Sequence, residues 1–323
     1  MKIAVIDDYQ NAFLTLKCFP KLAGHEVVVY TDTANDVASL AEKLKDADAV
    51  VLTQQRSYFS RALIEKLPKL RLIGQSGRAA THIDLQACTE KGIVVSAGGT
   101  GNSGTTAELT WGLILSALRN LPFEVAQLKA GRWQTTVGVG VKGKTIGIYA
   151  YGKIGSIVAA VGKAFGARVI CWGREGSTGR AKTAGFDVAK SREEFFAEAD
   201  IVSLHLPLNK DTRGIVTRDD LARMKPTALL VNASRSGLIA TGALVDALKA
   251  GRPGKAAVDV YDVEPVSATE QLVKMDNVIC TPHLGYVTRE SYEEYYAVVV
   301  DDIVSFAASK PSHVLNPEAL GKK

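Results

Sequence analysis

Short apolar runs alternate with longer amphipathic stretches along almost the whole chain. In the first hundred residues KIAVI, VVVY, AVVL, RLIG and IVV have the length and β-branched content of strands. Stretches such as VASLAEKLKDA and SRALIEKL lie between them and have helical periodicity. A second set of predicted strands follows a long helical pattern that begins near Thr105: TIGIYA, ARVICW, DIVSLHL, ALLVNA, KAAVDV and NVICT. Strands that alternate with helices indicate parallel sheets with helices on both faces.

Two loop-like segments mark the organisation of the chain. SAGGTGNSG, residues 96–104, precedes the long helical pattern, and GRWQTTVGVGVKGK, residues 131–144, precedes the second set of strands. We therefore predict two doubly wound α/β domains, residues 1–100 with 286–323 and residues 101–285. The final helical pattern, ESYEEYYAVVVDDIVSFAA, is expected to return to the first domain and tie both domains across a shared cleft.

Composition narrows the classes of function. Hydrophobic residues make up 46% and charged residues 23%, and the net charge of +5 is spread without long blocks, which argues against nucleic-acid binding. MKIAVIDDYQ reaches two aspartates too early for a signal peptide, and the apolar stretch Leu109–Leu118 is too short to span a bilayer. We expect a cytoplasmic protein without a metal site, with reduced thiols at the widely spaced Cys18, Cys88, Cys171 and Cys280.

The strand TIGIYA runs into a glycine-rich turn and then into the helical pattern SIVAAVGKAFG. The turn reads A-Y-G-K-I-G over residues 150–155, where dinucleotide-binding domains have G-x-G-x-x-G. Gly152 would let the backbone approach a pyrophosphate, Gly155 would let the helix pack closely, and the helix N-terminus would attract the phosphates. Ala150 is compatible with this turn if its φ is negative. The pattern predicts that residues 101–285 form a Rossmann nucleotide-binding domain.

The next strand, ARVICW, ends at Gly173-Arg174, where an acidic residue would bind the ribose hydroxyls of NAD. Gly173 has no side chain to repel a phosphate, and Arg174 can pair with one. Ser177, Thr178 and Arg180 would add further donors. This corner favours binding of NADP(H). Binding of NAD(H) remains an alternative, since a solvated Arg174 would allow both cofactors to bind.

Arg235, Glu264 and His283 each follow a predicted strand, within NASRSG, DVYDVEP and TPHLG. The carboxyl ends of parallel strands line one crevice, so we expect the three side chains to face a common cleft. Arg235 suits a carboxylate or a polarised carbonyl, and His283 can carry a proton near neutral pH with Glu264 orienting its ring. Taken alone, Arg235 could equally form a surface ion pair, Glu264 could be a turn residue, and His283 could be packed in the core. Together they predict that His283 protonates a carbonyl oxygen while a nicotinamide delivers hydride.

Taken in order, these motifs resemble the D-isomer-specific 2-hydroxyacid dehydrogenases. The matching elements lie between about residues 70 and 290 and are GKTIGIYAYGKIG, SLHLPL with Thr212, NASRSG, AAVDVYDVEP, TPHLG and AELTWGLIL. The resemblance implies an NAD(P)-dependent oxidoreductase of small 2-oxo and D-2-hydroxy acids, with catalytic Arg235, Glu264 and His283. It also implies a flavodoxin-like substrate domain completed by the C-terminal helix, and a homodimer formed through WGLILSALRNL and the loop Gly131–Gly143.

The resemblance assigns further residues. Asp259 would contact the nicotinamide carboxamide, within a set of cofactor-binding residues comprising Tyr151, Gly152, Lys153, Ile154, Gly155, Gly173, Arg174, Pro207, Thr212, Ala233, Ser234 and Asp259. The substrate carboxylate would bind the turn Ser76-Gly77-Arg78-Ala79.

The chain departs from the family at three points. Arg78 indicates a second anionic group on the substrate, a tighter clamp on its carboxylate, or a solvent-facing loop residue. Thr81-His82 stands where the family usually has Asp-Asn, and Tyr286 stands where it often has Gly or Ala, which would narrow the pocket. The alternative function is that of a dinucleotide-sensing corepressor on the same fold, although the extra segments of such proteins have no obvious counterpart in these 323 residues.

Overall fold

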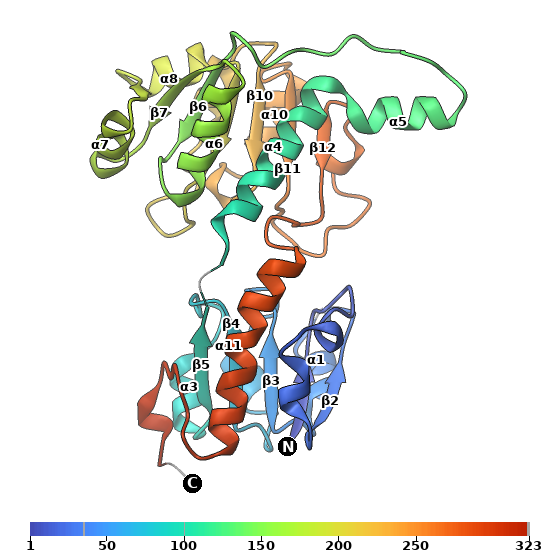
Figure 1. Cartoon of the computed structure of the whole chain (residues 1–323), viewed down its shortest axis with the longest axis vertical. Coiled ribbons are helices and arrows are strands. Elements are labelled where there is room, and N and C mark those ends of the chain that lie inside the picture. Colours follow the sequence, from blue (N-terminus) through green and yellow to red (C-terminus); the bar gives the residue numbers. More distant parts are fainter. Residues whose placement is uncertain (35, 100, 322–323) are drawn as a thin grey trace. The chain divides into compact units, whose positions relative to one another are not determined.

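The computed structural model describes residues 1–34, 36–99 and 101–321, which divide into two compact units (Figure 1). Unit 1 comprises Met1–Asn102 with Thr288–Lys323, and unit 2 comprises Ser103–Val287. Each boundary lies slightly beyond the predicted ends at residues 100 and 285. Asn35, Thr100, Lys322 and Lys323, which belong to the predicted first domain, lie outside the described residues.

Unit 1 is built on a parallel sheet whose strand order is β2-β1-β3-β4-β5, the flavodoxin-like order. The strands are β1 (Lys2–Val5), β2 (Glu26–Val29), β3 (Ala49–Leu52), β4 (Leu72–Ser76) and β5 (Val94–Gly98). The helices are α1 (Val37–Leu44), α2 (Arg61–Ile64), α3 (Leu85–Glu90), α11 (Arg289–Ala307) and the 3-10 turns η1 (Phe13–Thr15), η2 (Phe19–Leu22) and η5 (Pro317–Ala319).

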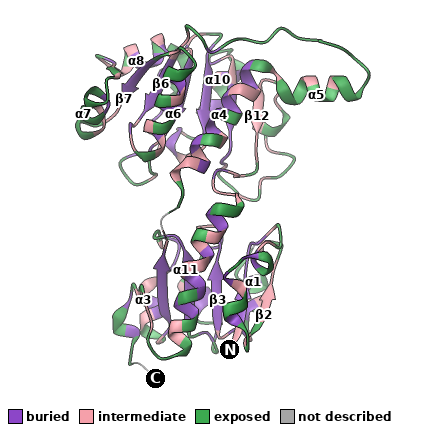
Figure 2. Ribbon diagram, viewed as in Figure 1, coloured by how far each residue is buried: buried purple, intermediate pink, exposed green. Residues whose placement is uncertain are grey.

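Every residue of β3, β4 and β5 is buried, which explains the mainly apolar sequences of these strands (Figure 2). Leu40, Leu63 and Cys88 bring α1, α2 and α3 into one core with the sheet. The C-terminal helix α11 packs against β4 at Gly74, where a Cβ atom would lie 2.7 Å from the Val299 side chain. The prediction that the C-terminal helix completes this domain is confirmed.

Unit 2 contains a seven-stranded parallel sheet in the order β12-β11-β10-β9-β6-β7-β8. The strands are β6 (Thr145–Tyr149), β7 (Arg168–Trp172), β8 (Asp187–Val188), β9 (Ile201–Leu204), β10 (Leu229–Asn232), β11 (Lys255–Val258) and β12 (Val278–Cys280). The first six, in chain order, have the Rossmann arrangement 3-2-1-4-5-6. The predicted fold class is therefore confirmed for both units.

Two layers of helices cover the sheet of unit 2. Trp111 and Val158 pack α4 and α6 into one core, and Phe195, Leu221 and Leu244 pack α8, α9 and α10 into another. The helices are α4 (Ser103–Arg119), α5 (Leu121–Lys129), α6 (Lys153–Ala164), α7 (Glu175–Thr183), α8 (Arg192–Glu198), α9 (Arg218–Arg223), α10 (Ala243–Lys249) and the 3-10 turns η3 (Ser236–Leu238) and η4 (Leu272–Lys274).

Helix α5 differs from the other α-helices of unit 2 because none of its residues is buried. Figure 1 shows α5 and the loop after it reaching away from the sheet of this unit. Apolar side chains are exposed along both segments, including Phe123 at 50%, Trp133 at 76% and Val137 at 96%. Few soluble proteins leave so many large apolar groups together in water without a partner.

Candidate active site

The three predicted catalytic residues follow strands that are neighbours in the sheet of unit 2. Strand β11 pairs in parallel with β10 on one side and with β12 on the other. Arg235 follows β10, Glu264 follows β11 and His283 follows β12. Their backbone positions therefore share the carboxyl edge of the sheet, where open α/β proteins bind their ligands.

Glu264 and His283 form a close pair at this edge. The Nδ1 atom of His283 lies 2.6 Å from Oε2 of Glu264. The other carboxylate oxygen, Oε1, accepts a hydrogen bond from the Tyr261 backbone N–H at 3.0 Å. The exposed fractions of the His283 and Glu264 side chains are 21% and 22%, so solvent screens the pair only partly. Since both carboxylate oxygens are engaged, Glu264 fixes the orientation of the imidazole and balances its charge when it is protonated.

Asp259 holds the backbone that carries His283. Its buried Oδ1 accepts hydrogen bonds from the Thr281 hydroxyl and the Leu284 N–H, both at 2.7 Å, and its Oδ2 accepts one from the Gly285 N–H at 2.9 Å. Burial raises the pKa of this carboxyl group. Between the anchored residues, His283 has a φ of 54°, a left-handed conformation that is uncommon for a residue with a side chain. This supporting role was not predicted, although Asp259 was singled out as a cofactor contact.

The hydroxyl groups of Thr105 and Thr106 fix the same turn from α4. They donate to the Gly285 carbonyl at 3.2 Å and 2.9 Å. Tyr286, the aromatic departure noted in the sequence, lies next in the turn and its ring meets that of His283 edge to face, with centroids 5.7 Å apart. The imidazole thus lies between a carboxylate and an aromatic ring.

The loop that carries Arg235 is tied to its neighbours through the backbone. The Asn232 side chain donates to the Arg235 carbonyl at 2.9 Å, and the Ser234 hydroxyl donates to the Leu206 carbonyl at 2.6 Å. The Arg235 guanidinium is exposed and donates from Nη1 to the Ser234 carbonyl at 2.7 Å. Among the other predicted cofactor residues of this edge, the Thr212 hydroxyl donates to the Pro207 carbonyl at 2.7 Å, and Ala233 is half-buried.

The A-Y-G-K-I-G turn follows β6 and fits a dinucleotide pyrophosphate. A Cβ atom at Gly152 would meet nothing within 4 Å, so the space beside its backbone is open. At Gly155 a Cβ atom would lie 2.5 Å from the Ala150 carbonyl oxygen, so only glycine allows the helix to pack there. Helix α6 begins at Lys153 without a side-chain cap, which leaves its first N–H groups, including that of Ile154, for phosphate oxygens.

Two residues of this turn, Ala150 and Tyr151, have conformations or contacts that the sequence did not indicate. Ala150 has a φ of 75°, so the condition of a negative φ, under which alanine suits this turn, is not met, and the alanine occupies a left-handed position that glycine normally fills. Tyr151 is buried, and its N–H donates to the Ser177 hydroxyl at 2.6 Å. Its carbonyl accepts from Nη2 of Arg180 at 3.1 Å. Helix α7 therefore clamps the turn through Tyr151.

The corner after β7 exposes a cation. The Arg174 side chain is 74% exposed, and its Nη2 lies 3.3 Å from Oδ2 of Asp211, which is 56% exposed. Gly173 precedes it with a φ of 155°. The Thr178 hydroxyl donates to the Glu175 carbonyl at 3.0 Å within the helix.

The predicted substrate turn, residues 76–79, follows β4 in unit 1. The Ser76 hydroxyl accepts from the Gln54 N–H at 2.8 Å, and the Gly77 N–H donates to the Gly98 carbonyl at 2.8 Å. The N–H groups of Arg78 and Ala79 have no partner among the residues that the structure describes, and both residues are exposed. Two adjacent backbone donors of this kind suit a carboxylate.

His82 and Gln54 flank the substrate turn. His82 is only 4% exposed, its two ring nitrogens have no partner in the described part of the chain, and burial lowers its pKa to about 4. It is therefore neutral at pH 7 and adds no charge to the turn. Gln54 was not predicted as a site residue. Nothing in the sequence indicates its left-handed φ of 56°.

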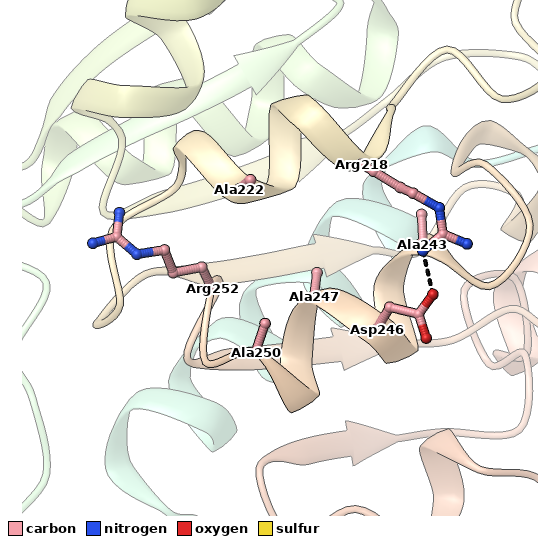
Figure 3. A pocket seen from close by; sticks show the side chains of 7 residues that line it. All are labelled: Arg218, Ala222, Ala243, Asp246, Ala247, Ala250 and Arg252. Carbon is pink, nitrogen blue, oxygen red and sulfur yellow. Dashed lines mark hydrogen bonds and ion pairs between the residues drawn. The ribbon is translucent and has the colours of Figure 1, made fainter.

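A groove on the surface of unit 2 lies apart from these residues. It has a volume of about 240 Å³ and runs between α9 and α10, with the Arg218–Asp246 ion pair and Arg252 flanking alanine side chains (Figure 3). No predicted site residue lines it. Across residues 1–34, 36–99 and 101–321, no cluster of three or more acidic, histidine or cysteine side chains could hold a metal ion. No helix in those ranges combines the length and apolar character that crossing a membrane requires.

Residues 111–285, which carry the three strand-end residues and the glycine-rich turn, match a family model described as D-isomer specific 2-hydroxyacid dehydrogenase, NAD binding domain. The chain belongs to the D-isomer specific 2-hydroxyacid dehydrogenase family. The resemblance expected from the motifs is thereby confirmed, and the Rossmann unit is the NAD-binding domain of this family.

Two relatives illustrate the sequence similarity. The D-3-phosphoglycerate dehydrogenase of Methanocaldococcus jannaschii is 39% identical over 280 residues, which are 86% of this chain and 53% of that protein. The glyoxylate reductase of Aeropyrum pernix is 35% identical over 292 residues, 87% of each chain. The chain thus spans about half the length of the first relative and most of the second.

Solved structures of the family match both units. The crystal structure of a phosphoglycerate oxidoreductase from Vibrio cholerae O395 has a TM-score of 0.93 at 44% sequence identity, covering 96% of this chain and 99% of that chain. An oxidoreductase structure from Ralstonia solanacearum has a TM-score of 0.96 at 46% identity, covering 99% of this chain and 98% of that chain.

Proposed function

We propose that this protein interconverts small 2-oxo acids and D-2-hydroxy acids with a nicotinamide cofactor and prefers NADPH. The observation that carries the proposal is the His283–Glu264 pair, with Nδ1 and Oε2 2.6 Å apart at the carboxyl edge of the Rossmann sheet. An imidazole oriented by a carboxylate is a common acid–base catalyst. Arg235 follows the neighbouring strand at the same edge.

In the reducing direction, His283 protonates the carbonyl oxygen of the acid. Because Nδ1 is bonded to Glu264, the exchanged proton is carried on Nε2. Arg235 binds an oxygen of the acid, and together with the imidazolium it stabilises the negative charge that develops. When bound, a reduced nicotinamide would supply the hydride that the carbonyl carbon accepts. In the oxidising direction, His283 removes the hydroxyl proton.

Gly152, Lys153 and Ile154 hold the pyrophosphate in this proposal because the turn is open beside Gly152 and α6 begins without a side-chain cap. The preference for NADPH rests on the corner after β7, where Arg174 is exposed and no acidic side chain occupies the position of the ribose-binding acid. Further cofactor contacts are assigned to Pro207, Thr212, Ala233, Ser234 and, on the carboxamide, Asp259.

The substrate carboxylate is assigned to the turn Ser76–Ala79 of unit 1, where the N–H groups of Arg78 and Ala79 are unpaired within the described chain. The relatives are named for glyoxylate and for 3-phosphoglycerate, so the acid is small, with or without a second anionic group. Arg78 would bind such a group.

The protein is also proposed to be a homodimer. Helix α5 and the loop after it expose Leu121, Phe123, Leu128, Trp133 and Val137, which a second copy of the chain would cover. Light scattering should then give twice the mass of 34.5 kDa.

The decisive experiment follows NADPH and NADH absorbance with glyoxylate, hydroxypyruvate, pyruvate and the 2-oxo form of 3-phosphoglycerate. We expect turnover of at least one acid and a higher kcat/KM with NADPH. No turnover with any of them would leave only a dinucleotide-binding role, and a clear preference for NADH would contradict the cofactor assignment.

His283→Ala should lower kcat by about 10²–10⁴-fold while NADPH binding, followed by fluorescence, is retained. Glu264→Gln serves as a graded comparison, because an amide can still hold the ring but does not carry the charge. The loss of kcat in Glu264→Gln should be smaller than the loss in His283→Ala. An unchanged kcat in His283→Ala would exclude the assigned role.

A further inference from the structure

The corner that carries Arg174 has a fixed position relative to the glycine-rich turn. The Ser177 hydroxyl bonds to the Tyr151 N–H, and Arg180 bonds to the Tyr151 carbonyl. A Cβ atom at Gly173 would lie 3.5 Å from the Ala150 Cα atom, so the corner also touches the turn directly. Arg174 is the N-cap residue of α7, and its backbone cannot move far from the turn.

Asp211 reaches Arg174 from the other side of this turn. In the sheet, β6 lies between β9 and β7, and the glycine-rich turn follows β6. Asp211 lies in the loop after β9, and Arg174 lies in the corner after β7. Their contact, 3.3 Å between Nη2 and Oδ2, therefore joins the two strand ends that flank the turn.

The loop that carries Asp211 is ordered by its own side chains. The Asn209 Oδ1 accepts hydrogen bonds from the Asp211 N–H at 2.9 Å and the Thr212 N–H at 3.2 Å. The Thr212 hydroxyl donates to the Pro207 carbonyl at 2.7 Å and closes the loop. The Asp211 carboxylate is thus held on the β9 side of the glycine-rich turn, where it contacts the Arg174 guanidinium.

We propose that Asp211 is a specificity-determining residue that limits the preference for 2′-phosphorylated dinucleotides. The inference rests on the proposed pairing of Arg174 with the 2′-phosphate. A phosphate monoester carries about −1.5 to −2 charges at pH 7, so Asp211 both competes with it for Arg174 and repels it. A dinucleotide with a free ribose hydroxyl has no 2′-phosphate, so Asp211 neither repels it nor competes with it for Arg174. Because the pair is exposed, the effect is modest, about two- to fivefold in affinity.

Titration calorimetry with adenosine 2′,5′-bisphosphate and adenosine 5′-monophosphate tests this without turnover. Asp211→Asn should tighten the bisphosphate about two- to fivefold and leave the monophosphate unchanged. The gain should shrink at high ionic strength and in the Arg174→Ala background. Asp219→Asn, an exposed carboxylate on α9, removes the same charge elsewhere and should change neither affinity.

Equal changes for both nucleotides, no change in Asp211→Asn, or an equal gain in Asp219→Asn would overturn the inference. If Arg174→Ala weakens the bisphosphate selectively while Asp211→Asn has no effect, the NADPH assignment stands and only the role of Asp211 falls. If Arg174→Ala has no selective effect, the cofactor assignment falls as well. A protein that binds neither nucleotide would overturn both.

Discussion

The two sheets each carry a buried aspartate near the carboxyl end of a strand, Asp7 after β1 in unit 1 and Asp259 after β11 in unit 2. Burial raises the pKa of both carboxyl groups. Asp7 accepts hydrogen bonds from two hydroxyl groups, those of Thr33 at 2.9 Å and Ser57 at 2.7 Å. Asp259 accepts one from a hydroxyl group and two from backbone N–H groups.

The difference lies in what each carboxylate holds. The partners of Asp7 are side chains on neighbouring loops, so its hydrogen bonds join three strand ends of unit 1. The backbone partners of Asp259 belong to Leu284 and Gly285, directly after His283. Similar burial thus stabilises a loop cluster in one unit and positions His283, the proposed acid–base residue, in the other. Burial and pKa alone do not distinguish the two roles.

Replacing each aspartate by asparagine should separate these roles most strongly. Hydrogen bonds to a charged group contribute about 1.5–3 kcal/mol, so loss of the Asp259 charge should displace the His283 turn and lower kcat about 10- to 100-fold. Asp7→Asn should lower the urea midpoint and leave kcat within about threefold, because its partners lie in loops without an assigned catalytic residue. Steady-state kinetics and urea unfolding of both variants make the comparison.

Equal losses of kcat in the two variants would remove the distinction between the two carboxylates. The pH profile adds a readout that simple destabilisation does not move. If Asp259 positions the imidazole, the acid limb of kcat should change in Asp259→Asn and not in Asp7→Asn.

His82 allows the comparison to be extended to the acid stability of unit 1. The pKa of His82 is lowered to about 4 by burial, against about 6.5 in an unfolded chain. Between these values the unfolded state binds the extra proton, so stability is complete above pH 6.5 and is lost as the pH falls towards 4. From pH 7 to pH 5 the free energy of unfolding should fall by about 2 kcal/mol through this residue alone.

Urea unfolding of His82→Asn at pH 7 and pH 5 should show a correspondingly smaller difference between the two conditions. His25→Asn, which removes a half-buried imidazole of the same unit, is the matched control. An undiminished acid sensitivity in His82→Asn would mean that other groups cause it.

Most of the fold could be predicted because most strands of the two sheets are largely buried and have mainly apolar sequences. Strand β8 was missed because two residues, Asp187 and Val188, are too few to show a pattern. Arg235, Glu264 and His283 could be singled out because strand ends in parallel sheets converge on one edge. The hydrogen bonds from Asp259 to a turn more than twenty residues later could not be predicted, since they depend on tertiary packing.

The smallest expected effect concerns the turns after β4 and β6, which hold their left-handed residues differently. Unit 1 has Gly77 there, with a φ of 89°, and unit 2 has Ala150, with a φ of 75°. A residue with a side chain destabilises the folded state by about 1–2 kcal/mol in the left-handed conformation, and glycine avoids this cost. Glycine gives back about 0.5–1 kcal/mol of this stability, because its backbone has more conformational freedom to lose on folding. Ala150→Gly should therefore raise the free energy of unfolding by about 0.5–1 kcal/mol, and Gly77→Ala should lower it by a similar amount. Urea unfolding decides both signs, and a destabilised Ala150→Gly would show that the Ala150 methyl group contributes more by packing than its backbone conformation costs.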